Sequence, residues 1–199
     1  MTVTVVDLGV GNIPNVVRAF GRLGYEVRVT SEPEEVGRAR VLVLPGVGAA
    51  PVAVASLDCT GLRQALEEAV ANGAWLLGIC LGHQLLFEKL EEFGEHRGLG
   101  FVPGVVSALP ATVRVPHMGW AKVEAERKDF PSLNRRWFYF VHSYAARPLP
   151  EDVLAVTHHD GEPVCAAVRR GRVVGVQFHP EKSGPAGAAF LEEFLEKVC

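Results

Sequence analysis

The 199-residue sequence is poor in cysteine and lacks long basic or apolar runs. Its four cysteines form no Cys-x-x-Cys pair, which argues against a structural zinc site. Its longest basic runs are pairs, at residues 135–136 and 169–170, and its net charge is -3, so it lacks the charge pattern typical of nucleic-acid-binding proteins. No apolar run reaches the roughly 18 residues that a membrane-spanning helix needs.

The start of the chain also lacks the features of a secretion signal. Residues 1–7 contain no basic segment and are typical of a β-strand. Without such a signal, four cysteines in an apolar-rich chain indicate reduced thiols, and we expect a cytoplasmic protein. Cys59, Cys165 and Cys199 have no motif around them, so we expect them to be structural.

The first half of the sequence alternates between strand and helix patterns. Apolar or β-branched runs predict strands over residues 3–7, 26–30, 41–44 and 75–79. Amphipathic patterns predict helices over residues 12–23, 62–71 and 81–91. This alternation predicts an α/β fold whose mostly parallel central sheet is flanked by helices.

The second half is dominated by strand patterns. These predict strands over residues 105–108, 113–115, 137–141, 153–157, 163–168 and 172–178, followed by a helix over residues 186–198. Proline and glycine turns separate the strands, so we expect antiparallel additions to the sheet. We find no repeat, low-complexity tract or linker, and expect one domain spanning residues 1–199.

The segment Gly-Ile-Cys-Leu-Gly at residues 78–82 has the spacing of a nucleophile elbow with Cys80 as the nucleophile. It follows a predicted buried strand and opens a predicted helix. A sharp turn between the two forces the nucleophile into strained backbone angles, and glycines beside it avoid collisions. The turn presents the sulfur at the carboxyl edge of the sheet, where open α/β sheets bind ligands.

A thiol nucleophile needs a base, and His179 is the best placed of the seven histidines. It ends the predicted strand 172–178, so it can reach the same sheet edge as Cys80. Glu181 follows two residues later and is expected to fix the imidazole tautomer, as the third member of a triad does. We expect His83 to be packed or solvated, and the neighbouring His158 and His159 to be a turn-exposed pair rather than metal ligands.

Acyl transfer through a thiol also needs donors for the developing oxyanion. The backbone N–H of Leu81, directly after the nucleophile, is one candidate. The glycine-rich loop at residues 45–48 is expected to supply another, from the backbone of Val47 or Gly48. A tight turn or a phosphate cradle is the alternative for such a loop.

Two segments together make the chain resemble the class I (triad) glutamine amidotransferases: Gly-Ile-Cys-Leu-Gly-His-Gln at residues 78–84 and Gln-Phe-His-Pro-Glu at residues 177–181. Within that family it is most similar to the glutaminase subunits of imidazole glycerol phosphate synthases. The supporting segments are residues 9–12, 44–48, 115–120, 139–144 and 179–183. The resemblance covers essentially the whole chain.

The resemblance implies a glutaminase that needs no cofactor and no metal. It implies that Cys80 attacks the side-chain amide of glutamine and that His179 moves the proton, oriented by Glu181. By the same resemblance, the glutamine is held at Gln84, Ser143 and Tyr144. These positions match those that bind the substrate in the family.

The resemblance also implies a partner, a (βα)8-barrel cyclase subunit that forms a heterodimer with the chain and uses the ammonia in histidine biosynthesis. Four side chains near the motifs are expected to form the docking face: Met118, Trp120, Tyr139 and Lys182. Tryptophan and tyrosine are enriched among residues that anchor interfaces.

The sequence departs from this family at three positions, with His83, Ala50 and Ala121 where Met, Phe and Asn are common. A His-Gln pair at residues 83–84 is usual in the glutaminase subunits of anthranilate and aminodeoxychorismate synthases, which remain an alternative. A stand-alone cysteine hydrolase is another. None of the departures affects the predicted triad.

Overall fold

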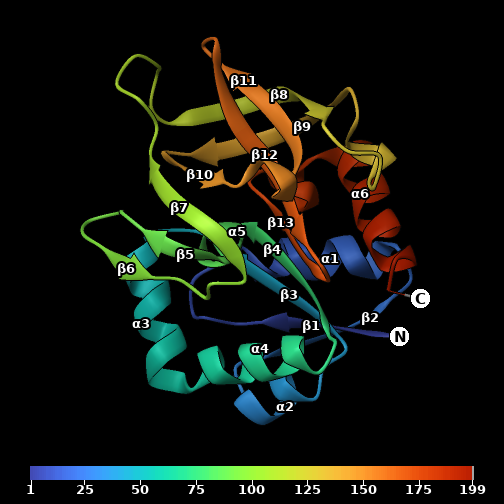
Figure 1. The fold of residues 1–199 in the computed structure, drawn as a ribbon. Helices are drawn as coiled ribbons and strands as arrows, with labels where there is room; N and C mark the ends of the chain where they lie inside the picture. The colour runs from blue at the N-terminus through green and yellow to red at the C-terminus, as the bar shows by residue number, and fades with distance from the viewer. Residues whose placement is uncertain (199) are drawn as a thin grey trace.

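The computed structural model describes residues 1–198, and Cys199 lies outside the described residues. Within this range the chain forms two β-sheets with helices packed around them (Figure 1). The larger sheet has nine strands in the order β2-β1-β3-β4-β13-β12-β11-β8-β9. Their bounds are β1 Thr2–Val6, β2 Glu26–Thr30, β3 Val41–Gly46, β4 Trp75–Cys80, β8 His117–Ala125, β9 Arg136–His142, β11 Val153–His159, β12 Glu162–Arg170 and β13 Val173–Val176.

The pairing within the larger sheet confirms the predicted mixture of directions. Strands β2, β1, β3, β4 and β13 pair in parallel, and β12, β11, β8 and β9 continue the sheet with antiparallel pairs. Strand β13 joins the two parts, because it is parallel to β4 and antiparallel to β12. The last residues of β4 and β13 therefore meet at one edge of the sheet.

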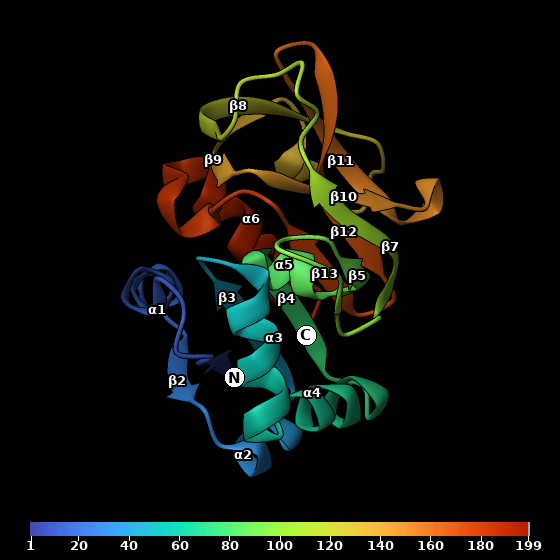
Figure 2. The same cartoon turned by 90° about the vertical axis from the view of Figure 1, so that its left-hand side faces the viewer.

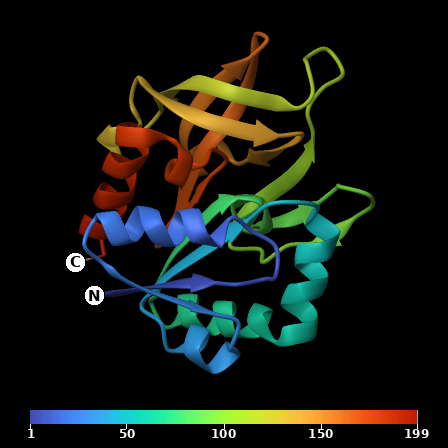
Figure 3. The ribbon, with the colours of Figure 1, turned by 180° about the vertical axis from the view of Figure 1, so that it is seen from behind.

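Two layers of helices cover the parallel part of the sheet (Figures 1 and 3). One layer contains α1 (Ile13–Arg22) and α6 (Gly184–Glu196), and the other contains α2 (Pro33–Gly37), α3 (Ala50–Thr60) and α4 (Leu62–Ala71). Alternate side chains of β3 serve the two layers: Val41 and Val43 pack with the α1 and α6 core, and Leu42 and Leu44 with the α3 and α4 core. This explains why the strand is apolar at consecutive positions.

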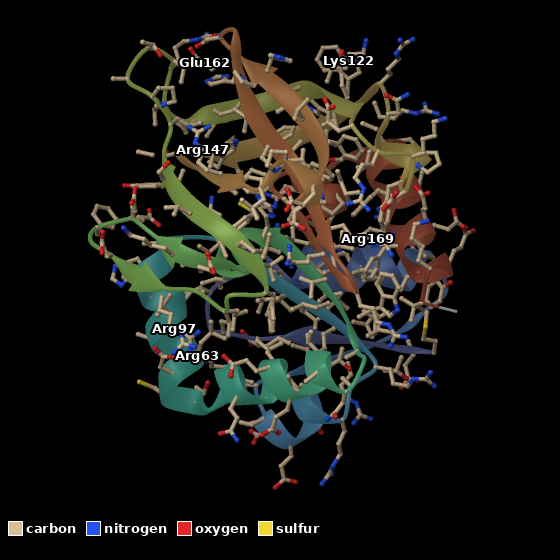
Figure 4. All side chains as sticks on the ribbon, viewed as in Figure 1. Arg63, Arg97, Lys122, Arg147, Glu162 and Arg169 are labelled. Carbon is tan, nitrogen blue, oxygen red and sulfur yellow. The ribbon has the colours of Figure 1, made fainter. Side chains whose placement is uncertain are left out.

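The smaller sheet has four strands in the order β10-β7-β5-β6, with bounds β5 Phe87–Leu90, β6 His96–Arg97, β7 Val102–Ala108 and β10 Tyr144–Pro148. Figure 2 shows β5 and β7 beside α5 (Leu81–Leu85), the helix that follows β4. Arg63, which lies close to Arg97 in Figure 4, fastens this sheet to α4, because its guanidinium donates to the carbonyls of Gly98 (2.6 Å) and Arg97 (3.2 Å). The sequence patterns did not predict this second sheet.

The predicted helix over residues 81–91 is wrong beyond its first turn. Helix α5 ends at Leu85, and Phe87 begins β5, which pairs with both β7 and β6. Phe87 and Leu90 are buried in the core that the two sheets and α3 share. Strand pairing and burial therefore override the helical preference of the local sequence.

The predicted strand over residues 113–115 is also wrong, because these residues lie in the loop between β7 and β8. Pro110 and Pro116 flank the segment, and proline cannot donate to a strand ladder. The backbone N–H of Arg114 donates instead to the carboxylate of Asp160, at 3.0 Å. Residues 1–198 also contain three short 3-10 helices, η1 (Pro131–Leu133), η2 (Pro150–Asp152) and η3 (Pro180–Lys182).

Cys59, Cys80 and Cys165 are free thiols in residues 1–198. Across the same residues, none of the helices combines the length and apolarity that crossing a membrane demands.

Candidate active site

The turn between β4 and α5 holds Cys80 in a strained backbone conformation, with φ of 54° and ψ of -107°. A side chain at either flanking glycine would collide with backbone atoms, those of the neighbouring strand β3 for Gly82 and those of the turn itself for Gly78. A Cβ on Gly82 would lie 1.7 Å from the carbonyl oxygen of Leu44, and one on Gly78 would lie 2.7 Å from that of Gly82. The spacing Gly-x-Cys-x-Gly is therefore a steric requirement of the turn.

The pairing of β13 with β4 brings His179 to the same edge of the sheet as Cys80. Val176, the last residue of β13, is in register with Ile79, and Cys80 directly follows Ile79. His179 comes three residues after Val176, and its backbone N–H donates to the carbonyl of Tyr139 at 2.9 Å. The predicted meeting of the two distant segments is therefore present in the structure.

Glu181 holds the imidazole of His179 from the side opposite the thiol. The two atoms His179 Nδ1 and Glu181 Oε1 are 2.8 Å apart, and both side chains are almost fully buried. A carboxylate only accepts, so Nδ1 carries the proton in this hydrogen bond. The neutral imidazole then has its lone pair on Nε2, which is the form that a general base needs.

His179 Nε2 is available to accept a proton, because it has no hydrogen-bond partner in residues 1–198. The Cys80 thiol instead donates to the carbonyl oxygen of Val141, at 3.8 Å. Burial lowers the pKa of His179 and is the largest single effect, but hydrogen bonding and charge interaction with the Cys80 sulfur and the Glu181 carboxylate together outweigh it. The pKa is therefore raised well above its usual value, which makes the imidazole a strong base for the proton that Cys80 gives up.

A cavity of about 320 Å³ opens beside the sulfur, a size within the usual range of small-molecule sites. It brings together Cys80 and five other residues predicted from the sequence. These are Gly48, Leu81, Gln84, Ser143 and Tyr144.

The two residues of the predicted oxyanion loop lie differently. Gly48 lines the cavity and has φ of +102°, a conformation that favours glycine. Val47 is not among the cavity residues, and the residue is 37% exposed. Leu81, the first residue of α5, lies directly beside the sulfur in the chain.

The four predicted docking residues form one continuous row, which we call the β8–β9 row. Met118 and Trp120 are exposed on β8, and Trp120 is in register with Tyr139 on β9, with ring centroids 6.2 Å apart. The ammonium group of Lys182 lies 5.8 Å from the centre of the Tyr139 ring. Tyr139 lies in turn 6.5 Å from the ring of His179, so the row adjoins the catalytic histidine candidate.

The sequence motifs did not assign a role to two titratable residues of the cavity, Glu92 and His142. Glu92 follows β5, directly after the region wrongly predicted as helix, and its carboxylate accepts a 2.7 Å hydrogen bond from the N–H of Ala50 at the start of α3. His142 lies inside the recognised segment 139–144, so its position in that motif was the available signal.

His142 is held neutral by its surroundings. Its Nδ1 contacts the carbonyl oxygen of Tyr144 and its Nε2 contacts Nδ1 of His117, both at 2.9 Å. Because the carbonyl only accepts, His142 donates to Tyr144 and accepts from His117. Burial is the main cause that lowers the pKa of His142 to about 3 and that of His117 to about 4. Both rings therefore carry no charge at neutral pH.

His83 is packed in the core behind the elbow rather than directed at the sulfur. It is fully buried, its ring lies edge-on to Phe87, and neither ring nitrogen has a hydrogen-bond partner in the described part of the chain. Burial, followed by the neighbouring His142, lowers the pKa of His83 to about 3. An unpaired buried imidazole costs stability.

The prediction that His158 and His159 form a turn-exposed pair is wrong for His159, because both residues end β11 and only His158 is exposed. His159 stacks on His117, with ring centroids 4.2 Å apart, and its Nε2 contacts the carbonyl oxygen of Arg114. Over residues 1–198 we find no group of three or more His, Cys, Asp or Glu side chains arranged to hold a metal ion.

Comparison with known proteins identifies the family. The model of the glutamine amidotransferase class-I family matches residues 4–198, nearly the whole chain. The chain belongs to the class-I glutamine amidotransferase family. This confirms the resemblance inferred from residues 78–84 and 177–181.

Curated relatives narrow the position of this amidotransferase within the family. The imidazole glycerol phosphate synthase subunit HisH of Streptococcus sanguinis is 46% identical over 198 residues, covering 98% of this chain and 95% of the relative. The subunit of the same name from Carboxydothermus hydrogenoformans is 45% identical over 201 residues and covers all of both chains. A crystal structure of a glutamine amidotransferase shares the fold, with a TM-score of 0.79, 24% identity and 98% coverage of both chains.

The elbow glycine of this amidotransferase gives a first prediction. Gly82→Ala should lower the free energy of unfolding by about 3 kcal/mol or more, because its Cβ would overlap the carbonyl of Leu44. Urea denaturation measures the change. Gly21→Ala is the matched control: Gly21 lies in α1 with open space around it, and should gain roughly 0.5–1 kcal/mol. Equal stability of the two variants would contradict the steric account.

The unpaired imidazole of His83 gives a second prediction. His83→Met should raise the free energy of unfolding at pH 7.5 by about 1–3 kcal/mol, because it removes a buried group without partners. The folded-state pKa of His83 lies below its unfolded value, so the unfolded chain binds more protons as the pH falls below about 6.5. The advantage of His83→Met should therefore grow between pH 7.5 and pH 5.

Urea denaturation at both pH values measures this effect. The matched control is His158→Met at an exposed position, which should change little at either pH. A His83→Met chain that is less stable than the parent at pH 5 would show that the imidazole is satisfied in solution.

Proposed function

We propose that the chain is the glutaminase subunit of an imidazole glycerol phosphate synthase. It hydrolyses glutamine to glutamate and passes the ammonia to a cyclase subunit, which makes imidazole glycerol phosphate and aminoimidazole carboxamide ribotide in histidine biosynthesis. Two curated relatives at 45–46% identity carry the name of that synthase subunit. The observation that carries the chemistry is that Cys80, which lines the cavity, interacts with the His179–Glu181 pair.

The reaction begins with a proton transfer. The S–H bond of Cys80 breaks, its proton passes to Nε2 of His179, and the sulfur forms a bond to the side-chain amide carbon of glutamine. His179 then gives the proton to the amide nitrogen, which leaves as ammonia while a glutamyl thioester remains on Cys80. Water hydrolyses the thioester with His179 again as base, and glutamate and the free thiol result. Glu181 keeps Nδ1 protonated throughout and stabilises the imidazolium.

The oxyanion of each tetrahedral intermediate is stabilised by backbone N–H groups. Leu81 supplies one, directly after the nucleophile, and the loop at Val47 and Gly48 supplies the other. The positive φ of Gly48 and the exposure of Val47 support a loop that can turn a peptide group. A turn of this loop on partner binding would switch hydrolysis on, so that glutamine is not wasted.

The walls of the cavity suit an α-amino acid. The carboxylate of Glu92 provides a partner for the substrate ammonium group, and Gln84, Ser143 and Tyr144 provide side-chain and backbone hydrogen bonds. The neutral rings of His142 and His117 add no positive charge to compete with that ammonium group. No cofactor or metal takes part in these steps.

The partner is a cyclase subunit of (βα)8-barrel fold that forms a heterodimer with this chain. Ammonia must reach the cyclase unprotonated, so it needs a path from which water is excluded. The β8–β9 row adjoins His179 and exposes Met118 and Trp120, which suits docking directly over the site of ammonia release. One glutaminase domain spans residues 1–199 and acts in the cytoplasm.

Two alternatives make different predictions. The glutaminase subunits of anthranilate and aminodeoxychorismate synthases share the His-Gln pair at residues 83–84, but the chain would then bind a chorismate-using partner. A stand-alone cysteine hydrolase would turn over glutamine at the same rate without any partner. Co-purification with each candidate synthase subunit, and glutaminase rates with and without the cyclase, distinguish the three.

The function is tested by Cys80→Ala in complex with the cyclase subunit. Glutamine-dependent synthesis should fall by at least about a thousandfold, because the nucleophile is gone. Synthesis from added ammonium salt should persist, because the cyclase chemistry does not use the thiol. The matched control, Cys59→Ala at an exposed cysteine, should retain both activities. Loss of both activities in Cys80→Ala would show that Cys80 is structural and contradict the proposal.

A further inference from the structure

A chain of hydrogen bonds leads from a backbone carbonyl to the sulfur of Cys80. The side-chain nitrogen of Gln84 donates to the carbonyl oxygen of Tyr144 at 2.9 Å and to Oε1 of Gln177 at 3.1 Å. The side-chain nitrogen of Gln177 lies 3.8 Å from the sulfur. Gln84 is 5% exposed and Gln177 is fully buried, so water does not compete for these bonds.

The direction of these hydrogen bonds is fixed by the backbone carbonyl of Tyr144. A backbone carbonyl can only accept, so Gln84 must turn its NH₂ group toward Tyr144. The second hydrogen of that NH₂ group points at Gln177, which must therefore present its oxygen. The NH₂ group of Gln177 is then left facing Cys80. The orientation of both amides thus follows from a carbonyl that belongs to β10.

We propose that Gln177 is a catalytic residue whose side-chain N–H stabilises the Cys80 thiolate. The inference rests on the proposed role of Cys80 as nucleophile. When the S–H bond breaks, the proton goes to His179 Nε2 and the electron pair stays on the sulfur. A hydrogen bond from Gln177 to that anion favours the charged form of the thiol.

The surroundings of the sulfur show why this donor matters. Cys80 is 7% exposed, so little water can solvate a thiolate there, and the carbonyl oxygen of Val141 faces the sulfur as an acceptor that repels an anion. Apart from the His179 imidazole, which receives the proton, Gln177 is the one side-chain donor within residues 1–198 that lies against the sulfur. The titratable groups around the sulfur are His179 and Glu181 after β13, His142 on β9, Glu92 after β5 and, behind the elbow, His83 on α5.

The same series of hydrogen bonds connects the thiol with the wall of the cavity. Gln84 and Tyr144 line the cavity in which glutamine is proposed to bind, and both take part in the series of hydrogen bonds that orients Gln177. A ligand that moves Gln84 would therefore also move the donor on Gln177. This connection predicts that changes at Gln84 alter the reactivity of the thiol even when no glutamine is present.

The test is the rate at which iodoacetamide alkylates Cys80 in the full chain, measured from pH 5 to pH 10 with peptide-resolved mass spectrometry. Gln177→Met removes the donor at similar side-chain length. It should raise the midpoint of the rate profile by about one pH unit, which is about a tenfold slower reaction below the midpoint. Gln84→Met keeps the Gln177 donor but removes the hydrogen bond that orients it. This variant should shift the midpoint in the same direction by less.

Two controls make the result specific. Gln64→Met changes an exposed glutamine of α4 and should leave the Cys80 profile unaltered, and the exposed Cys59 should alkylate identically in every variant. Unchanged midpoints in Gln177→Met and Gln84→Met, with both chains shown to be folded by circular dichroism, would overturn the proposal.

If Gln177→Met does not fold, Gln84→Met decides alone: a raised midpoint supports the proposal and an unchanged one overturns it. The assay uses no glutamine, so its outcome is separate from the proposed function. If the variants raise the alkylation midpoint but the protein has no glutaminase activity, the proposed function is wrong and the role of Gln177 as a donor is still supported.

Discussion

The pairing of β13 with β4 is the constraint on which the rest of the site depends. Its parallel register puts Val176 opposite Ile79, and every catalytic candidate follows from the way the two strands end. Cys80 ends β4 at a sharp turn that requires a glycine on each side. His179 follows the end of β13 and is hydrogen-bonded to Glu181. A shift of one residue in this register would point the side chains to the opposite face and separate sulfur from imidazole.

Much of this arrangement could be predicted from the sequence, because it is encoded locally. The continuous apolar runs of β3 and β4 indicate strands buried on both faces. The glycines around Cys80 indicate a turn with no room for side chains. Both patterns can be recognised in the sequence alone. The predictions of a helix over residues 81–91 and of a strand over residues 113–115 were wrong for a different reason. Phe87 and Leu90 become a strand only because β7 and β6 lie beside them, and Arg114 leaves the ladder because Asp160 takes its N–H.

The roles of the remaining residues depend on long-range hydrogen bonds that no local pattern contains. Glu92 reaches the cavity because β5 is a strand, and its hydrogen bond with Ala50 joins that strand to the helix after the predicted oxyanion loop. Gln177 belonged to a recognised motif, but its orientation depends on Gln84 and on a carbonyl of β10. Buried polar networks of this kind fix geometry when every member has a partner, and His83 shows the cost of one that has none.

The central claim is that the sulfur of Cys80 and the imidazole of His179 act together beneath a pocket for glutamine. The most direct measurement is covalent labelling with a chloroketone analogue of glutamine, followed by mass spectrometry of the peptides. We expect one label per chain, on Cys80, formed at least about a hundredfold more slowly in His179→Ala. Labelling of Cys59 or Cys165 in place of Cys80, or an unchanged rate in His179→Ala, would contradict the account.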